Sequence, residues 1–389
     1  MRIGIVLSNT PGYSETFFLS KIKGLQAQGH QVILFTQTNN NNFTLWKVKA
    51  SYPIFKRNLV KQMAWFLVVF FKMLGSSKAV WLFIKLEKKQ KTPFSKILKK
   101  LYASAHILTE QLDWLHFGFA TMALGKENVA KSIGANMAVS LRGFDMAIYP
   151  VKNPNCYRLL WRNVDKVHTI SNDLLDLAYH NGLSKEVPVQ KITPAIDTNF
   201  FNNSKQVFKA DECLKLFTVA RLHWKKGLSY ILRALAILKQ QGVNFEYTIV
   251  GEGAQYEELR YTIHLLNLEA QVSLLGKQTP KEIKDLMKTN QVYVQYSISE
   301  GFCNAVLEAQ AMGLLCVVSD AEGLSENVLH KETGWVVPKY NAKALADEII
   351  KVLNLDEKEK LKIIENAKIR VKQEFNIEKQ QEEFIQFYS

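Results

Sequence analysis

Two glutamates, Glu300 and Glu308, are the residues of this chain whose type and spacing point most directly to chemistry. They lie in the segment 297–313, which reads SISEGFCNAVLEAQAMG and predicts a helix from about Asn304. Carboxylates accept hydrogen bonds from neighbouring hydroxyls, often two at a time, and are poor partners for phosphate. The pair therefore suits a sugar ring or a ribose. Acidic side chains that only stabilise a helix N-terminus are the alternative, which explains one glutamate better than two.

A basic cluster precedes these glutamates in the same half of the chain. Arg221, Lys225 and Lys226 follow a strand predicted at 216–220, and Gly227 leads from them into a helix. The free N–H groups and the dipole at a helix N-terminus add to side-chain cations, so this position holds phosphate well. A solvated basic turn would give the same pattern. Together with the two glutamates, however, the cluster indicates a sugar that carries phosphates.

Four further strand ends carry glycine or polar residues. Residues 251–253 (Gly-Glu-Gly) follow a strand predicted at 247–250, and residues 11–14 (Pro-Gly-Tyr-Ser) form the first strand-to-helix loop. Glycine in such loops permits either a tight turn or the close approach of a ligand. His116 and residues 142–145 (Arg-Gly-Phe-Asp) are the other two sites. The residues alone leave both undecided, since a lone histidine is more often packed than functional.

These side chains need a scaffold of parallel strands, and the hydrophobic pattern predicts one. Residues 2–36 read as strand, turn, helix over 15–28 and strand, with Ser14 as the N-cap and Gly29 as the stop. Such a βαβ opening implies a parallel sheet. Two doubly wound units that face one another would place ligands at the carboxyl ends of their strands. Further strands are predicted at 137–141, 166–170, 216–220, 247–250, 272–275, 292–295 and 315–319.

Length and composition favour two domains. The chain of 389 residues is long for one hydrophobic core, and 47% apolar with 22% charged residues is the composition of a globular protein. The polar segment 198–213 is the expected linker, which gives domains at 1–197 and 198–389. The end of the chain is expected to be helical and to pack back on the N-terminal domain.

The cysteines and the N-terminus point to the cytoplasm. The four cysteines are scattered without a CxxC pair, which argues against a zinc site and a disulfide framework. The opening MRIGIVLSN has too short an apolar run for a signal peptide and reads as a strand. The strongest apolar run, residues 64–71, is interrupted by Lys72 and falls short of the ~20 residues that cross a bilayer.

Basic charge is concentrated in residues 47–100. This segment holds fourteen Lys or Arg and one acid, Glu87, so its net charge of +13 accounts for nearly all of the chain's +14. Residues 40–105 are otherwise irregular in pattern and rich in aromatics. Lysines mixed with aromatics suit a helix that lies on an anionic membrane surface, apolar face down. Aromatics that pack in a core while the lysines are merely solvated are the alternative.

With these residues assembled, the chain resembles the retaining glycosyltransferases of family 4, which have the two-domain GT-B fold. The resemblance is carried by VARLHWKKG (219–227), IVGEG (249–253), SEGFCNAVLEAQAMG (299–313) and TGWVVP (333–338). The N-terminal half is most similar to exopolysaccharide glycosyltransferases of the colanic-acid and amylovoran type, through SETF (14–17), LHFG (115–118) and SLRGFDM (140–146). The resemblance as a whole implies an α/β fold of two facing Rossmann-like domains with a donor cleft between them.

For matching positions the resemblance implies that the site binds a nucleotide-diphosphate sugar. Arg221 and Lys226 would bind the diphosphate and stabilise the departing nucleotide. Glu300 would contact the donor sugar, Glu308 would hold the ribose hydroxyls, and His116 would touch the sugar near the reaction centre. The other donor-binding candidates are Gly12, Gly251, Glu252, Gly253, Gly301 and Phe302. The acceptor-side candidates are Tyr13, Arg142 and Asp145.

The resemblance also implies a front-face mechanism without metal ion or cofactor, because positive side chains would neutralise the leaving group. The acceptor is expected to be a saccharide, lipid-linked, and the protein to be cytoplasmic and peripheral on the inner face of the cell membrane. Three positions depart from the family's pattern. The first loop has one glycine, and Cys303 and Ala195 stand where glycine is usual. None of these changes removes a charged group.

Two other classes of protein are compatible with part of the sequence. A sugar-nucleotide epimerase can share this architecture, but the Glu-x7-Glu element favours transfer. A basic protein that binds nucleic acid or membrane without transferase activity would explain the charge. It would leave Glu300, Glu308 and the strand-end loops without a purpose, so no nucleic-acid partner is expected.

Overall fold

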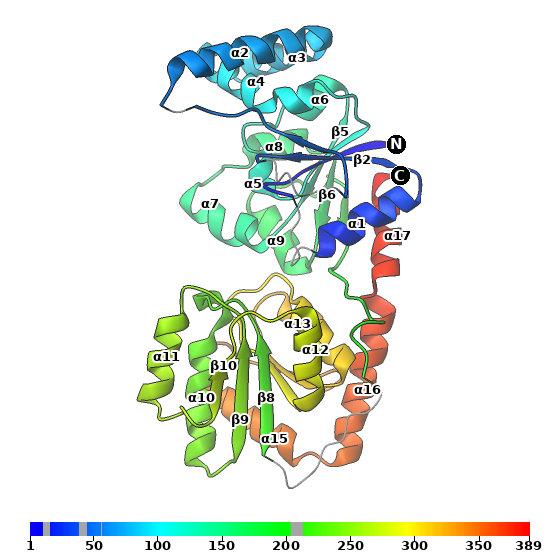
Figure 1. The fold of residues 1–389 in the computed structure, drawn as a ribbon. Coiled ribbons are helices and arrows are strands. Elements are labelled where there is room, and N and C mark those ends of the chain that lie inside the picture. Colours follow the sequence, from blue (N-terminus) through cyan, green and yellow to red (C-terminus); the bar gives the residue numbers. More distant parts are fainter. Residues whose placement is uncertain (11–15, 39–44, 56, 204–212) are drawn as a thin grey trace. The chain divides into compact units, whose positions relative to one another are not determined.

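The computed structural model describes residues 1–10, 16–38, 45–55, 57–203 and 213–389 (Figure 1). The first loop, with Gly12, Tyr13 and the predicted N-cap Ser14, lies outside the described residues. The chain divides into two compact units, each with its own parallel sheet. Unit 1 comprises Met1–Ile192 and Gln381–Ser389, and unit 2 comprises Thr193–Gln380.

Unit 1 is built on a seven-stranded sheet in which all neighbouring strands are parallel. Its strands are β1 (Arg2–Val6), β2 (Gln31–Thr36), β3 (Val48–Ala50), β4 (Trp114–Phe117), β5 (Asn136–Ser140), β6 (Lys166–Thr169) and β7 (Val189–Lys191). The order is β3-β2-β1-β4-β5-β6-β7, so the direction of winding reverses between β1 and β4. The central strands are buried apolar runs, as expected for a parallel sheet that helices cover.

The last helix of the chain completes the core of unit 1. Gln381 donates a hydrogen bond to the backbone oxygen of Ser20 at 3.2 Å, and Phe384 packs edge-on against Phe17 with ring centroids 5.4 Å apart. Figure 1 shows this helix, α17, beside α1. The helices of this unit are α1 (Thr16–Ala27), α2 (Leu59–Met73), α3 (Ser77–Lys89), α4 (Phe94–Leu108), α5 (Ala120–Ala123), α6 (Val129–Ile133), α7 (Tyr149–Lys152), α8 (Arg158–Asn163), α9 (Asn172–His180) and the end of α17 (Ile377–Tyr388).

The interpretation of residues 40–105 as irregular was wrong, because much of this segment is helical. It forms α2, α3 and α4, and Asn58 caps α2 by accepting a hydrogen bond from the backbone of Lys61 at 2.9 Å. The helical period was hidden in the sequence because α2 is apolar on nearly every face. A strip of polar residues is what normally reveals a surface helix.

The expectation that the apolar run is too short for a membrane also needs correction. The chain is helical from Leu59 to Lys89, over 31 residues, and an 18-residue window within it has a mean hydropathy of 1.7. By length and composition this helix could cross a membrane. The uninterrupted apolar run covers only residues 64–71, whereas the helix continues through Lys72 to further apolar residues.

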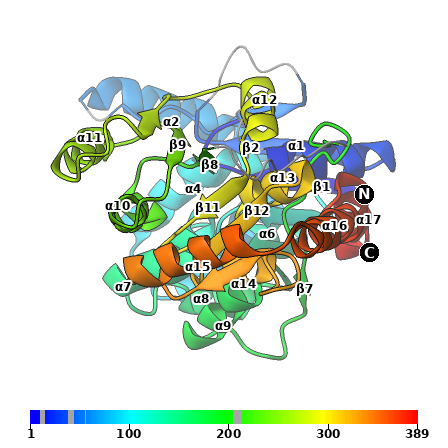
Figure 2. The same cartoon turned by 90° about the horizontal axis from the view of Figure 1, so that it is seen from below.

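Unit 2 is a second parallel sheet, of six strands, with helices on both faces (Figure 2). Its strands are β8 (Leu214–Val219), β9 (Phe245–Val250), β10 (Val272–Leu274), β11 (Val292–Gln295), β12 (Leu315–Ser319) and β13 (Trp335–Val337). Its helices are α10 (Leu228–Gln240), α11 (Tyr256–Leu265), α12 (Pro280–Thr289), α13 (Asn304–Met312), α14 (Leu324–Asn327), α15 (Ala342–Asn354) and α16 (Glu357–Glu374). The order β10-β9-β8-β11-β12-β13 reverses direction between β8 and β11.

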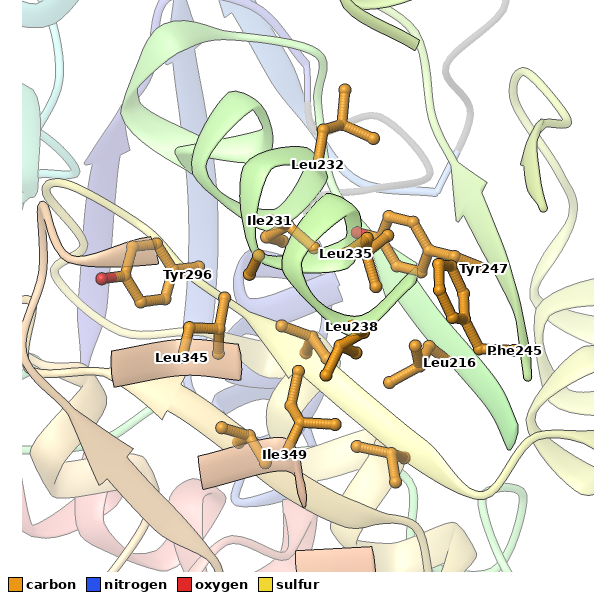
Figure 3. Close-up of a cluster of buried hydrophobic side chains, with 14 of the residues drawn as sticks. Leu216, Ile231, Leu232, Leu235, Leu238, Phe245, Tyr247, Tyr296, Leu345 and Ile349 are labelled. Carbon is orange, nitrogen blue, oxygen red and sulfur yellow. The ribbon is translucent and has the colours of Figure 1, made fainter. Parts of the chain in front are cut away.

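The core of unit 2 follows from the helical spacing of leucine and isoleucine. Ile231, Leu235 and Leu238 of α10 are fully buried against the sheet side chains Leu216 and Tyr247 (Figure 3). Helix α15 adds Leu345 and Ile349 to the same cluster. This packing holds α10 against β8, so the turn between them is anchored at both ends. The basic cluster lies in that turn.

Candidate functional site

The candidate site lies at the switch point of the sheet in unit 2. Strands β8 and β11 are neighbours there, with Leu216 paired to Val292. The basic residues follow the carboxyl end of β8, and Glu300 follows the carboxyl end of β11. In an open parallel sheet, loops that leave such a point in opposite directions open a crevice in which ligands bind. The fold therefore brings together the two charged clusters that lie far apart in the sequence.

Lys226 and Glu300 form an ion pair at the centre of this site. Both side chains are mostly buried, with 16% and 14% exposed. Ser297 donates a second hydrogen bond to the same carboxylate, over 3.1 Å. Burial alone would lower the pKa of Lys226, but the adjacent carboxylate outweighs burial and raises it. The ammonium group is thus a fixed positive charge with a defined position.

Two further charged residues extend the site, and sequence reasoning missed both. Glu322 accepts a hydrogen bond from the backbone N–H of Glu300 at 2.9 Å, and Lys339 forms an ion pair with Glu322 at 3.0 Å. Lys339 also donates to the backbone oxygen of Ile298 over 3.4 Å. These residues follow β12 and β13. The signal that could have found them is their position, because each follows the carboxyl end of a short apolar strand.

Arg221 supplies the exposed positive charge of the site. Within the described parts of the chain its guanidinium has no hydrogen-bond or ion-pair partner. Lys225 lies close by, and burial together with the charges of Arg221 and Lys226 lowers its pKa, against the pull of Glu300. Three cations thus share one turn while a single carboxylate pairs with one of them. The surplus of positive charge suits a phosphate group.

Glu308 lies on α13 and is half-buried. Its carboxylate has no hydrogen-bond or ion-pair partner among the residues described by the structure. Burial raises the pKa of Glu308 to about 7. A half-buried carboxyl without a partner costs stability, and such groups are candidates for contact with a ligand.

Residues 301–303 shape the start of α13. Phe302 is buried and packs against Phe375 with ring centroids 5.6 Å apart. Cys303 is the N-cap, but its side chain makes no capping hydrogen bond. Its backbone is instead held by Asn327, which accepts from its N–H at 3.0 Å and donates to its oxygen at 3.1 Å. Gly301 lies against Gly323, at which a Cβ atom would overlap the Gly301 oxygen.

The Gly-Glu-Gly loop after β9 is explained by contact between two loops of the same unit. A Cβ atom on Gly251 or Gly253 would overlap the backbone oxygen of Ala220 or Leu222. The N–H of Leu222 donates to the oxygen of Glu252 at 2.9 Å, which ties the two loops together. The glycines therefore position the loop that carries Arg221. The Glu252 side chain points to solvent.

His116, by contrast, lies in the core of unit 1. The side chain is fully buried on β4. Its Nε2 atom lies 2.8 Å from the Ser140 hydroxyl, and its Nδ1 atom lies 2.6 Å from Tyr388 and 3.1 Å from Lys21. Burial followed by the charge of Lys21 lowers the pKa of His116. This placement favours a role in fixing α17 to the sheet over direct contact with a sugar.

Asp145 is also buried, and its contacts are structural. Its carboxylate accepts hydrogen bonds from the backbone N–H of Ala120 at 3.1 Å and from the Thr121 hydroxyl at 2.7 Å, at the N-terminus of α5. Burial raises the pKa of Asp145 although these hydrogen bonds oppose the shift. The Arg142 guanidinium lies over the Phe17 ring, 4.3 Å from its centroid. Gly12 and Tyr13 lie outside the described residues.

Comparison with known families identifies the domain that carries this site. Residues 199–370 match the family model described as "Glycosyl transferases group 1". That range includes the basic cluster, both glutamates, Glu322 and Lys339. The match therefore covers all the charged residues named above for the candidate site.

Similar proteins come from bacterial polysaccharide synthesis. The chain is 30% identical over 273 residues to the amylovoran biosynthesis glycosyltransferase AmsK of Erwinia amylovora, which covers 67% of this chain and 66% of that protein. It is 28% identical over 403 residues to the putative colanic acid biosynthesis glycosyltransferase WcaL of Escherichia coli, covering 97% and 96%. The chain thus spans about two thirds of the first relative and nearly all of the second.

Solved structures show the same fold over the whole chain. A glycosyltransferase from Rickettsia africae matches with a TM-score of 0.73 and 18% identity, covering 100% of this chain and 97% of that one. HepE from Anabaena, solved in complex with UDP-glucose, matches with a TM-score of 0.72 and 18% identity, covering 99% and 98%. Both neighbours have the GT-B arrangement of two Rossmann-like domains, which confirms the predicted fold class.

Proposed function

Residues 199–370 belong to the group 1 glycosyl transferases, and from this premise we propose that the protein moves a sugar from a nucleotide-diphosphate sugar to a saccharide acceptor in exopolysaccharide synthesis. The observation that carries the proposal is the convergence of Arg221, Lys226 and Glu300 at the β8/β11 switch point, with Glu308 on the helix that follows. The named relatives in amylovoran and colanic acid synthesis supply the class of acceptor.

The arrangement supports a different role for each charged residue of the site. Arg221 and Lys226 bind the diphosphate, because the basic turn holds three cations and Glu300 neutralises the charge of only one of them. The N–H groups at the start of α13, which the Cys303 side chain does not cap, face the same end of the sheet and add to this field. Glu308 holds the ribose hydroxyls, and Glu300 orients Lys226 and contacts the donor sugar.

We propose a family 4 enzyme with a front-face mechanism that retains the anomeric configuration. The bond between the anomeric carbon and the β-phosphate oxygen breaks while the acceptor oxygen bonds to the same face of that carbon. The acceptor's proton passes to the departing phosphate, so the products are the glycoside and the nucleoside diphosphate. Arg221 and Lys226 stabilise the negative charge that develops on the leaving group. The two cations supply this stabilisation without a metal ion or cofactor.

The acceptor is proposed to be a lipid-linked saccharide on the cytoplasmic face of the membrane. The support is the cationic, aromatic segment 47–100, which contains the helices of unit 1 that lie farthest from its sheet in Figure 1. A peripheral enzyme would reach such an acceptor without leaving the cytoplasm.

A donor panel tests the proposed function. UDP-, GDP- and ADP-sugars are compared for binding and for slow hydrolysis with the wild type and with Glu308→Ala. We expect one nucleotide sugar to bind and to release its sugar, and Glu308→Ala to weaken binding by about 10- to 100-fold, because the ribose loses a charged acceptor. Absence of a response to every donor would contradict the proposal. A nucleotide carrying an epimerised sugar, formed without acceptor, would assign the protein to the epimerases.

The raised pKa of Glu308 predicts a pH-dependent affinity for the donor. With a pKa of about 7, the carboxylate that accepts hydrogen bonds from the ribose is a minor species at pH 6 and the main species at pH 8. Affinity scales with the fraction of protein in the binding form, so we expect it to rise by about fivefold to tenfold between pH 6 and pH 8. Titration calorimetry measures this. A diphosphate diester does not titrate in that range, and Glu308→Gln should abolish the dependence. An unchanged profile in Glu308→Gln would assign the titration to another group.

A further inference from the structure

Helix α2 has an apolar face on each side. Its inner face packs in unit 1, where Val69 and Met73 are buried and the Phe66 ring stacks on Tyr102 with centroids 5.9 Å apart. Its outer face carries Val60, Met63, Leu67, Phe70 and Phe71, and Leu74 follows as the C-cap; these side chains are 49% to 80% exposed. A helix that is apolar all round is normally buried or in contact with lipid. Among the described residues, therefore, no protein segment covers the apolar outer face of α2.

The exposure is concentrated on this one helix. Across the described residues 24 large hydrophobic side chains are exposed, and eight of them lie between Leu59 and Leu74. Scattered exposed hydrophobic residues are normal, whereas a contiguous patch marks an interaction site. Trp81 of α3 (62% exposed) and Phe94 of α4 (61% exposed) add aromatic side chains on the two neighbouring helices.

The charges around this patch have one sign. The only acid between residues 47 and 100 is Glu87, which is fully buried and bound by Lys100 at 2.9 Å, Thr92 at 2.9 Å and Asn128 at 2.9 Å. The exposed charged side chains of α2, α3 and α4 are therefore lysines. Lys61 and Lys72 lie near the two ends of α2, and Lys78, Lys85 and Lys88 follow on α3.

We infer that the outer face of α2 docks on an anionic lipid surface, with Leu67, Phe70 and Phe71 in the boundary between headgroups and acyl chains and the lysines of α3 on the headgroups. Charge complementarity selects this occupant. A second copy of the chain would bring two cationic patches together, whereas an anionic bilayer neutralises them and buries the apolar side chains.

The inner face of α2 decides between lying on the membrane and crossing it. A membrane-spanning helix is surrounded by lipid, but Val69 and Met73 are covered by protein through their contacts in the cluster with Tyr102 and Ala105. The helix is therefore expected to lie in the plane of the surface. Lys61 extends over Phe55, with its ammonium 4.6 Å from the ring centroid, and Lys72 over Tyr52 at 5.3 Å. Both chains can reach the headgroups while their stems cover apolar surface.

Vesicle flotation tests the apolar part of the proposal. The full chain is mixed with vesicles of phosphatidylglycerol and phosphatidylcholine or of phosphatidylcholine alone, and the bound fraction is measured. We expect binding to the anionic vesicles and at least tenfold weaker binding for Leu67→Gln/Phe71→Gln, since two large exposed apolar groups are lost. Tyr261→Gln/Leu265→Gln on α11 is the matched control. These residues have the same spacing and 63% and 60% exposure, and their replacement should leave binding unchanged.

A second pair of variants tests the charge. Lys78→Gln/Lys85→Gln should weaken binding to the anionic vesicles by about tenfold or more, and the loss should shrink as salt rises. The control is Lys358→Gln/Lys362→Gln on α16, where two exposed lysines have helical spacing in unit 2. Equal binding by Lys78→Gln/Lys85→Gln and the wild type would overturn the proposal.

Three other outcomes would also overturn it. The first is a wild type that does not bind anionic vesicles. The second is a dimer in solution that becomes monomeric in Leu67→Gln/Phe71→Gln. The third is retention in membranes after carbonate extraction, which would show a spanning helix. Binding of the nucleotide sugar is measured on the same samples. Docking variants should keep it and Glu308→Ala should lose it, so failure of the docking proposal and failure of the proposed function are distinguishable.

Discussion

Replacement of Lys226 with Ala is expected to lower the rate of nucleotide release from the sugar donor by about 10²- to 10³-fold, the range seen when one fixed charge-stabilising donor is removed from an active site. The reason is geometric. Lys226 is held by Glu300 in a mostly buried ion pair at the end of the sheet, so its charge is in place before the leaving group develops its own. Single-turnover kinetics with the donor identified in the panel measures the effect.

A double variant separates catalysis from loss of the ion pair. Lys226→Ala leaves the Glu300 carboxylate without its cation, which would itself disturb the loop. Lys226→Ala/Glu300→Gln removes the unpaired charge, so it should recover stability but not the rate. Lys288→Ala breaks the exposed pair with Asp285, at 2.6 Å, and should change neither. Recovery of the rate in the double variant would show that Lys226 serves only the structure.

Much of the fold could be predicted because buried parallel strands appear in the sequence as short, continuous apolar runs. The predicted strand at 292–295 is β11 and that at 315–319 is β12, residue for residue. Such strands are short, apolar and bounded by polar turns, so their identity depends on local sequence. Helix α2 could not be recognised for the opposite reason. Its outer face is apolar although it is exposed within the described part of the chain, so the sequence shows no alternation of apolar and polar residues with the helical period.

The candidate site was predictable only where it obeys the strand-end rule. Arg221 and Lys226 follow one predicted strand and Glu300 another, and adjacent parallel strands bring such residues together. Glu322 and Lys339 could not be assigned to the site from the sequence, because they join it through contacts of the folded chain with Glu300 and with each other. The burial of His116 could not be foreseen, since its partners Tyr388 and Lys21 lie 272 and 95 residues away along the chain. His116 is buried because the last helix of the chain packs over it.

Gly227→Ala is expected to lower the free energy of unfolding of unit 2 by about 3 kcal/mol or more and to abolish donor binding. Gly227 has a φ of +58°, a conformation that costs an L-residue about 1–2 kcal/mol. A Cβ atom there would also overlap the backbone oxygen of Tyr296, which cannot move aside as a flexible side chain would. The loop would have to shift, and with it Lys226. Urea unfolding and binding of the donor measure the two effects.

Gly242→Ala isolates the contribution of this contact. Gly242 also has a positive φ, +77°, and lies in the same unit, but a Cβ atom there would meet nothing within 4 Å. Gly242→Ala should therefore cost only the backbone strain, about 1–2 kcal/mol, and leave donor binding intact. A comparable loss in both variants would mean that Gly227 is required for its conformation alone. A larger loss at Gly227 would show that close approach of the basic turn to the end of β11 is what sets the distance between the cations and Glu300.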